Sequence, residues 1–197
     1  MEQGAWSRER RAKKYGQCSS DKERRANGID IQTPQGLNRI RLKHKYLVMI
    51  TIRKANRTDT ETIIDFQQKM AWETEKMTLS PDIISKGVNG VFEDLSRGQY
   101  YVLESDGLVV ASLLITYEWS DWRNTNVWWF QSVYVLPEYR RTGVFRKMYS
   151  FIKDEAQKNK VAGLRLYVES KNLKARKTYE ALGMGSEHYT MYEWLRE

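Results

Sequence analysis

The residues best suited to chemistry in this sequence are a group of arginines around a glycine. Arg140, Arg141 and Arg146 flank Gly143, directly after the β-forming segment 131–136. Apolar residues recur at helical spacing beyond the glycine, so the loop leads straight into a helix. Where a loop enters a helix, unpaired backbone N–H groups and the positive end of the helix dipole converge. The segment therefore predicts a site for an anionic ligand, and the alternative is a plain strand-to-helix turn with solvated arginines.

A second group of chemically competent residues lies in a tryptophan-rich segment that precedes this loop. Residues 117–124 combine acidic and aromatic side chains, and Trp128 and Trp129 follow them. Tryptophan rings beside carboxylates make a suitable seat for a cationic amine. The same rings suit a hydrophobic core or the interface of a homodimer equally well. The candidates for holding or deprotonating an amine are Glu73, Glu118, Trp119, Asp121 and Trp122.

Local sequence patterns predict the elements that must position these residues. Apolar and polar residues alternate at 50–53, which predicts a first strand. Thr58 and Glu61 have the types and spacing of a capping box at the start of a helix. Pro81, directly after the potential cap Ser80, predicts the first position of a second helix. Two helices therefore follow the first strand.

The remainder of the chain changes its period several times. Asp106 and Gly107 are a turn signal between two β-forming runs, which predicts a hairpin. Asn172 is suited to cap a last helix, which stops at Gly183. The predicted strands are 100–104, 108–117, 127–135, 164–168 and 188–195, and a further helix follows Pro137. The order β-α-α-β-β-β-α-β-α-β predicts an α/β (α+β) fold whose mixed sheet has antiparallel hairpins first and a βαβ crossover later.

Charge divides the chain into two parts. Residues 1–48 hold 12 Lys and Arg against 5 Asp and Glu, whereas residues 49–197 hold 21 against 20. The first part has no helical or strand periodicity, so we expect 1–48 to be a basic, disordered extension of a domain at 49–197. Because the net charge of +8 resides mainly in this extension, it is weak evidence for nucleic acid binding, and no nucleic-acid partner is predicted.

Composition also argues against a metal site and a membrane segment. The single cysteine, Cys18, and two distant histidines, His44 and His188, do not form a metal-ligand pattern, so we expect no metal. No apolar run approaches the roughly 18 to 20 residues that cross a bilayer. The chain also lacks the apolar stretch of a secretory signal. These features predict a soluble, cytoplasmic protein with no membrane partner.

The arginine-rich loop resembles motif A of the GNAT superfamily of N-acetyltransferases. That motif reads Gln or Arg, two residues, Gly, one residue, then Gly or Ala, and Arg140, Gly143 and Phe145 occupy its three defined positions. Phe145 departs from the pattern, since a small residue is usual there. A second match is the strand end at 168–172 followed by a helix that carries Tyr179. The resemblance covers residues 50–195.

This resemblance implies a fold, a co-substrate and a set of roles. It implies a mostly antiparallel sheet of six to seven strands flanked by about four helices. It also implies transfer of an acetyl group from acetyl-CoA to the primary amine of a small molecule, directly, in a ternary complex. The strand before the loop would pair with the pantetheine arm and the loop would hold the pyrophosphate. The implied cofactor-binding residues are Val133, Tyr134, Val135, Arg140, Arg141, Thr142, Gly143, Val144, Phe145, Arg146 and Asn172.

The resemblance also implies catalytic roles. Tyr179 matches the family's general acid, although helical spacing alone would allow a buried core tyrosine. Gln131 stands where the polyamine and thialysine acetyltransferases have a glutamate base; an amide cannot accept the proton but can position a water. Glu118 is an alternative base and Glu73 an alternative contact to the amine. Two other functions fit the same residues, namely a non-catalytic acyl-CoA-binding module and acetylation of a protein amine.

Overall fold

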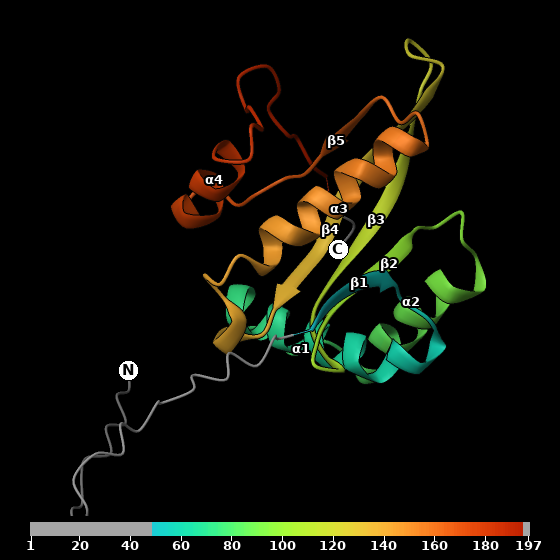
Figure 1. The fold of residues 1–197 in the computed structure, drawn as a ribbon, viewed down its shortest axis with the longest axis vertical. Coiled ribbons are helices and arrows are strands. Elements are labelled where there is room, and N and C mark those ends of the chain that lie inside the picture. The colour runs from blue at the N-terminus through green and yellow to red at the C-terminus, as the bar shows by residue number, and fades with distance from the viewer. Residues whose placement is uncertain (1–48, 195–197) are drawn as a thin grey trace, which may run out of the picture. The chain divides into compact units, whose positions relative to one another are not determined.

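A computed structural model of the 197-residue chain describes residues 49–194. The predicted basic extension at 1–48 lies outside the described residues, as do residues 195–197. Within the described part, five strands form one sheet and four α-helices accompany it (Figure 1).

The sheet is mixed, as its sequence order predicted. Its spatial order is the chain order: β1 (Ile50–Lys54), β2 (Gln99–Ser105), β3 (Leu108–Ser120), β4 (Thr125–Val135) and β5 (Gly163–Arg165). The first four strands are antiparallel neighbours, and β5 joins β4 in parallel after a helical crossover. A parallel neighbour requires such a crossover, since a short turn can join only antiparallel strands.

The helices occupy the predicted places in the chain order. They are α1 (Thr60–Glu75), α2 (Pro81–Glu93), α3 (Val144–Lys158) and α4 (Leu173–Glu180). Pro81 is the first residue of α2, as expected from its missing N–H group. Asn172 caps α4, because its side-chain oxygen accepts a hydrogen bond from the Ala175 N–H at 3.1 Å. These terminal signals are confirmed.

The β2–β3 hairpin also confirms its prediction. Asp106 and Gly107 both adopt positive φ, at 51° and 82°. Two-residue hairpin turns of this kind need positive φ at both central positions, because that twist matches the twist of the flanking strands. Aspartate tolerates the conformation and glycine has no Cβ to oppose it.

The capping box lies two residues earlier than predicted. Asn56 and Asp59, rather than Thr58 and Glu61, form it, at a 3₁₀ turn that leads into α1. The Asn56 side chain accepts from the Thr58 N–H, and the Asp59 carboxylate accepts from the Asn56 N–H, both at 2.8 Å. The prediction was wrong because two pairs with the same spacing compete here, and only Asp59 is also bound by Arg53.

The predicted final strand is absent from the described residues. Residues 188–194 have no strand partner, so the sheet has five strands and not six to seven. Alternation predicts a strand only where a neighbouring edge is available. Strand β5 offers a short edge, because its pairing covers three residues and not the five predicted at 164–168. Several side chains of the terminal segment remain exposed, including Tyr192 and Trp194.

The sheet carries a hydrophobic layer on each face. Tyr101 and Leu103 belong to the cluster that α3 covers, whereas Tyr100 and Val102 belong to the cluster of α1 and α2. Successive side chains of a strand point to opposite faces, so one short strand supplies both layers. Strand β4, which leads to the arginine-rich loop, is also packed on both sides: Phe130 belongs to the α3 cluster, and the Tyr134 ring lies 5.0 Å from that of Phe66 on α1.

A charged network fixes the start of α1 to the sheet. Arg53 on β1 donates to both carboxylate oxygens of Asp59, at 2.7 and 2.9 Å, and also pairs with Glu104 on β2. Asp59 is 4% exposed and is the one charged residue among the buried residues of the described part. The hydrogen bond from Arg53 holds the pKa of Asp59 below its ordinary value, against the opposing effect of burial.

We predict that Asp59→Asn lowers the free energy of unfolding by about 2 kcal/mol at pH 7, because it weakens an N-terminal cap and leaves Arg53 short of a partner. A carboxyl with a lowered folded-state pKa stabilises the fold above its unfolded-state pKa of about 3.9 and loses this effect as the pH falls further. Urea denaturation should therefore give a smaller difference at pH 3. Asp65→Asn, which removes an exposed ion pair with Lys69, is the control and should change little. An equal difference at both pH values would contradict this account.

Candidate active site

A bulge in β4 sets the direction of every side chain that approaches the loop. Ser132 has φ of 48°, and the register between β3 and β4 shifts at this point. The extra residue in the bulged strand reverses the alternation beyond it. Phe130 and Val133 consequently both contribute to the α3 side, whereas Tyr134 faces α1 and lies 5.0 Å from the Phe66 ring.

Strands β4 and β5 stop pairing just before the bulge at Ser132. Pairing between β4 and β5 ends at Trp129 and Arg165, while β4 continues to Val135. Over that continuation β4 remains paired with β3 on its other side, up to Ala111 opposite Val135. The edge of β4 at 130–135 that faces away from β3 is thus not paired with β5. Such an edge can accept an extended ligand as an additional strand.

The loop between β4 and α3 presents an uninterrupted series of backbone donors. Arg141 and Gly143 have positive φ, at 65° and 87°, and α3 begins at Val144. Among the described residues, the N–H groups at 141–146 have no hydrogen-bond acceptor. The first intrahelical bond at this end is from the Lys147 N–H to the Gly143 carbonyl. A cluster of free N–H groups at a helix N-terminus suits a phosphate.

Arg140 is tied to the protein and is not directed at a ligand. Its Nε donates to the Val135 carbonyl at 2.8 Å, and its Nη2 pairs with Glu73 Oε2 at 2.6 Å. The guanidinium carbon also lies 5.3 Å from the centre of the Tyr134 ring. These three contacts fix the first residue of the loop to the end of β4 and to the end of α1.

Glu73 therefore joins two elements that are far apart in sequence. Its second oxygen, Oε1, accepts a hydrogen bond from the Tyr134 hydroxyl at 2.9 Å. Burial, and then this hydrogen bond to a carboxylate, raises the pKa of Tyr134 to about 12. Both oxygens of Glu73 are occupied, so in this arrangement the carboxylate positions the loop.

The bulky residue in the loop motif is accommodated on the sheet side of α3. The Phe145 ring lies 6.4 Å from the rings of Phe130 and Tyr149 and 5.6 Å from that of Tyr179. The side chain thus packs into the core and away from the loop, which leaves its backbone N–H available. It also provides one wall against which Tyr179 rests.

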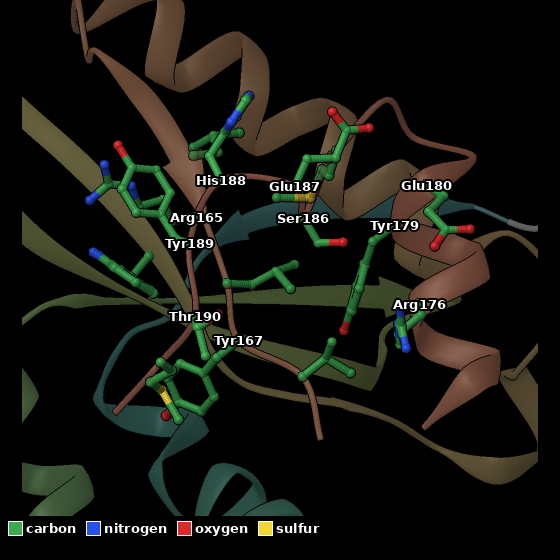
Figure 2. Close-up of a pocket in the computed structure, with 17 residues that line it drawn as sticks. Arg165, Tyr167, Arg176, Tyr179, Glu180, Ser186, Glu187, His188, Tyr189 and Thr190 are labelled. Carbon is green, nitrogen blue, oxygen red and sulfur yellow. The ribbon is translucent and has the colours of Figure 1, made fainter. Parts of the chain in front are cut away.

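A cavity of about 720 Å³ lies next to this aromatic contact. Its walls come from β5 and the residues that follow it, from α4, and from the segment 184–191. Figure 2 shows the Tyr179 side chain projecting from α4 into this cavity. Burial raises the pKa of Tyr179 above its ordinary value, so the phenol holds its proton at neutral pH. The cavity thus contains a neutral O–H donor.

Hydrogen bonds between polar side chains connect β3, β4, β5 and the residues that follow β5. The Gln131 Oε1 atom accepts a hydrogen bond from the Tyr167 hydroxyl at 2.6 Å, and its Nε2 is 3.5 Å from Thr116 Oγ1. Further along β3, the two oxygens of Glu118 accept hydrogen bonds from Trp129 Nε1 and Arg165 Nη1. Gln131 and Glu118 do not line the cavity, but Tyr167, Trp129 and Arg165, to which they bind, do.

The tryptophan-rich segment is not assembled around the cavity. Trp119 and Trp122 are 61% and 90% exposed at the β3–β4 turn, and neither lines the cavity. Asp121 accepts a hydrogen bond from the Trp122 backbone N–H. Sequence reasoning missed Arg165, Tyr167 and Tyr189, which line the cavity. The alternation of apolar and polar residues at 164–168 predicts a strand there, but the contacts that hold Arg165 in place come from residues distant in sequence.

The described residues hold no group of three or more His, Cys, Asp and Glu side chains that is arranged to bind a metal ion. In the same part of the chain, every helix is too short or too polar to span a lipid bilayer.

Comparison with known proteins identifies relatives of this fold. Residues 59–184 match the Acetyltransferase (GNAT) family. A search of curated proteins finds no match. Among solved structures, a possible acetyltransferase from Clostridium difficile 630 is 44% identical; the alignment covers 75% of this chain and 98% of that one, with a TM-score of 0.71.

Two more distant structures share the fold. The aminoglycoside N-acetyltransferase AAC(6')-Iy in complex with CoA is 15% identical over 76% of this chain and 96% of its own, with a TM-score of 0.63. A ribosomal-protein-alanine N-acetyltransferase from Brucella melitensis biovar Abortus 2308 is 14% identical over 75% and 100%, also with a TM-score of 0.63.

Proposed function

The chain belongs to the GNAT acetyltransferase family, and we propose that it moves an acetyl group from acetyl-CoA to the primary amine of a small molecule. The observation that carries this proposal is the juxtaposition of Tyr179, the Phe145 ring against which it rests, and the free N–H groups where α3 begins. One side chain thus spans the distance between an anion site and a cavity that holds a proton donor.

The loop and the edge of β4 are the proposed cofactor site. The free N–H groups at 141–146 would bind the pyrophosphate, with Arg141 and Arg146 adding positive charge. The unpaired edge at 133–135 would pair with the amide groups of the pantetheine arm. Thr142 donates its hydroxyl to the Tyr139 carbonyl and so stiffens the loop. Asn172 already caps α4, which leaves its amide nitrogen for the cofactor.

Acetyl transfer requires two proton transfers, one from the acceptor nitrogen and one to the departing sulfur. The acceptor nitrogen loses a proton and forms a C–N bond to the acetyl carbon, the C–S bond breaks, and the departing sulfur takes a proton. Tyr179 is the proposed acid, because burial keeps its phenol protonated. Gln131 would act through Tyr167, which lines the cavity: its amide oxygen accepts from the Tyr167 hydroxyl and fixes the direction of that group, which would hold the water that removes the amine proton. Glu118 is less suited as the base, since both of its oxygens accept hydrogen bonds.

The relatives differ in their acceptors, so the fold does not select one. They include an aminoglycoside N-acetyltransferase and a ribosomal-protein-alanine N-acetyltransferase. A cavity of about 720 Å³ is within the usual size range of small-molecule sites. This volume favours a small acceptor over a folded protein. The non-catalytic alternative predicts acetyl-CoA binding without turnover.

We predict that the full chain binds acetyl-CoA and CoA in a calorimetric titration, and that Glu73→Gln weakens acetyl-CoA binding about fivefold to tenfold. The variant loses the charged partner that fixes Arg140, and a charge-assisted hydrogen bond contributes about 1.5 kcal/mol or more. The rate at saturating acetyl-CoA should stay the same.

Glu75→Gln is the matched control, because this exposed carboxylate lies on the same helix and has no partner among the described residues. A raised KM for the amine with unchanged acetyl-CoA affinity in Glu73→Gln would instead place Glu73 in the acceptor site. No binding of acetyl-CoA by the folded wild-type chain would refute the proposed function itself.

We also predict that Tyr179→Phe lowers kcat about 100-fold or more with an acetyl-CoA dissociation constant within about twofold of wild type, since a general acid acts only in the transition state. Because burial raises the pKa of Tyr179 above the ordinary value of a phenol, wild-type activity should not decline through this group between neutral and mildly alkaline pH. Tyr192→Phe, a change at a 93% exposed ring, is the control and should behave as wild type. Wild-type rates from Tyr179→Phe would remove this residue from the mechanism.

A further inference from the structure

One wall of the cavity holds an arginine that is fixed on several sides. The Arg165 guanidinium carbon lies 5.8 Å from the Trp129 ring and 5.6 Å from the Tyr189 ring. Its Nη1 atom pairs with Glu118 at 2.7 Å, and its side chain is 33% exposed. Arg165, Trp129 and Tyr189 all line the cavity. The guanidinium is thus held in place before any ligand arrives.

This arrangement leaves the edge of the guanidinium available. Aromatic rings interact with the flat faces of a guanidinium, whereas its N–H groups point outward in its plane. Among the described residues, only Nη1 of Arg165 has a hydrogen-bond acceptor, and its Nε and Nη2 groups have none. Planar, in-line donors of this kind match the two oxygens of a carboxylate.

The acidic groups around the cavity are either bound within the protein or directed away from the Tyr179 phenol. Glu118 is the carboxylate next to Arg165, and hydrogen bonds already occupy both of its oxygens. Glu180 and Glu187 line the cavity, but Figure 2 shows their carboxylates directed away from the Tyr179 phenol. Arg176 contributes a further cation on the α4 side. Of the two carboxylates that line the cavity, neither is directed at the Tyr179 phenol, whereas Arg165 has N–H groups without an acceptor among the described residues.

Tyr179 and Arg165 lie on different walls of the cavity (Figure 2). We propose that the acceptor is an amine that also carries a carboxylate: the carboxylate binds the free edge of Arg165 while the amine extends towards the Tyr179 end. This inference rests on the proposed function, because it concerns the acceptor of the same reaction. The shared chemistry is that of an amino acid, either free or at the C-terminus of a short peptide.

The test compares acceptors that differ only in the carboxylate. Lysine is paired with cadaverine, ornithine with putrescine, phenylalanine with phenethylamine, and glycyl-lysine with its C-terminal amide. We expect the wild-type chain to favour the carboxylate-bearing member of at least one pair by about tenfold or more in kcat/KM. The peptide pair distinguishes a free amino acid from a C-terminal carboxylate.

Variants separate recognition from structure. Arg165→Gln should abolish the preference, chiefly by raising the KM for the carboxylate-bearing acceptor, with the dissociation constant for acetyl-CoA unchanged. Glu118→Gln also breaks the ion pair but retains the guanidinium, so it should preserve the preference. If both variants lose the preference to the same extent, the ion pair has only a structural role and the inference is overturned.

Two further results would overturn the inference without affecting the proposed cofactor. One is equal or faster turnover of the decarboxylated amines by the wild-type chain. The other is the absence of turnover with every acceptor of both series from a chain that binds acetyl-CoA in the calorimeter. A folded chain that does not bind acetyl-CoA would instead refute the proposed function, so the two failures are distinguishable.

Discussion

The rest of the candidate site depends on one constraint in β4, which cannot keep a partner on both edges along its whole length. Its register with β3 is maintained to Val135 only because an extra residue at Ser132 is accommodated by a positive φ. A non-glycine residue in this region of backbone space is held there at some energetic cost. In return, Tyr134 faces α1 while Val133 stays on the α3 side. The bulge thus supplies a buried anchor for the loop and the direction in which the loop leaves the sheet, next to the edge of β4 that β5 leaves unpaired.

The loop is held from both of its ends by interactions of different kinds. At its start, Arg140 is bound by Glu73 and by the Val135 carbonyl, which are polar contacts near the surface. At its end, the half-buried Phe145 ring packs among aromatic rings, one of which belongs to Tyr179. The free N–H groups between them need no side chain to hold a ligand. Of the two residues that carry the family resemblance, Arg140 therefore anchors the loop and Gly143 provides its backbone geometry. The charge of Arg140 is paired with Glu73 within the protein.

Much of the fold was predictable because its signals are local. The turn at Asp106, the start of α2 at Pro81 and the cap at Asn172 each depend on neighbours within a few residues. The contacts that define the site are not local: 67 residues separate Glu73 from Arg140, and 47 separate Glu118 from Arg165. A sequence pattern shows that a carboxylate is present but not which cation it meets, so Glu73 was predicted to contact substrate. The prediction of a last strand was wrong for a similar reason. A strand at 188–194 would need a longer neighbouring edge than the three residues of β5 provide.

The stacking of Arg165 on Trp129 has an optical consequence. Indole emission responds to nearby charge and to water, and Trp129 is in contact with a guanidinium on the cavity wall while its N–H group is bound by Glu118. Trp119 and Trp122 lie in solvent on the β3–β4 turn and contribute a background that occupancy of the cavity does not change. Replacing Trp72, Trp119, Trp122 and Trp194, whose side chains are all exposed, by phenylalanine would raise the share of the intrinsic fluorescence that Trp129 contributes. Ligand entry could then be followed in real time without a label attached to either the protein or the ligand.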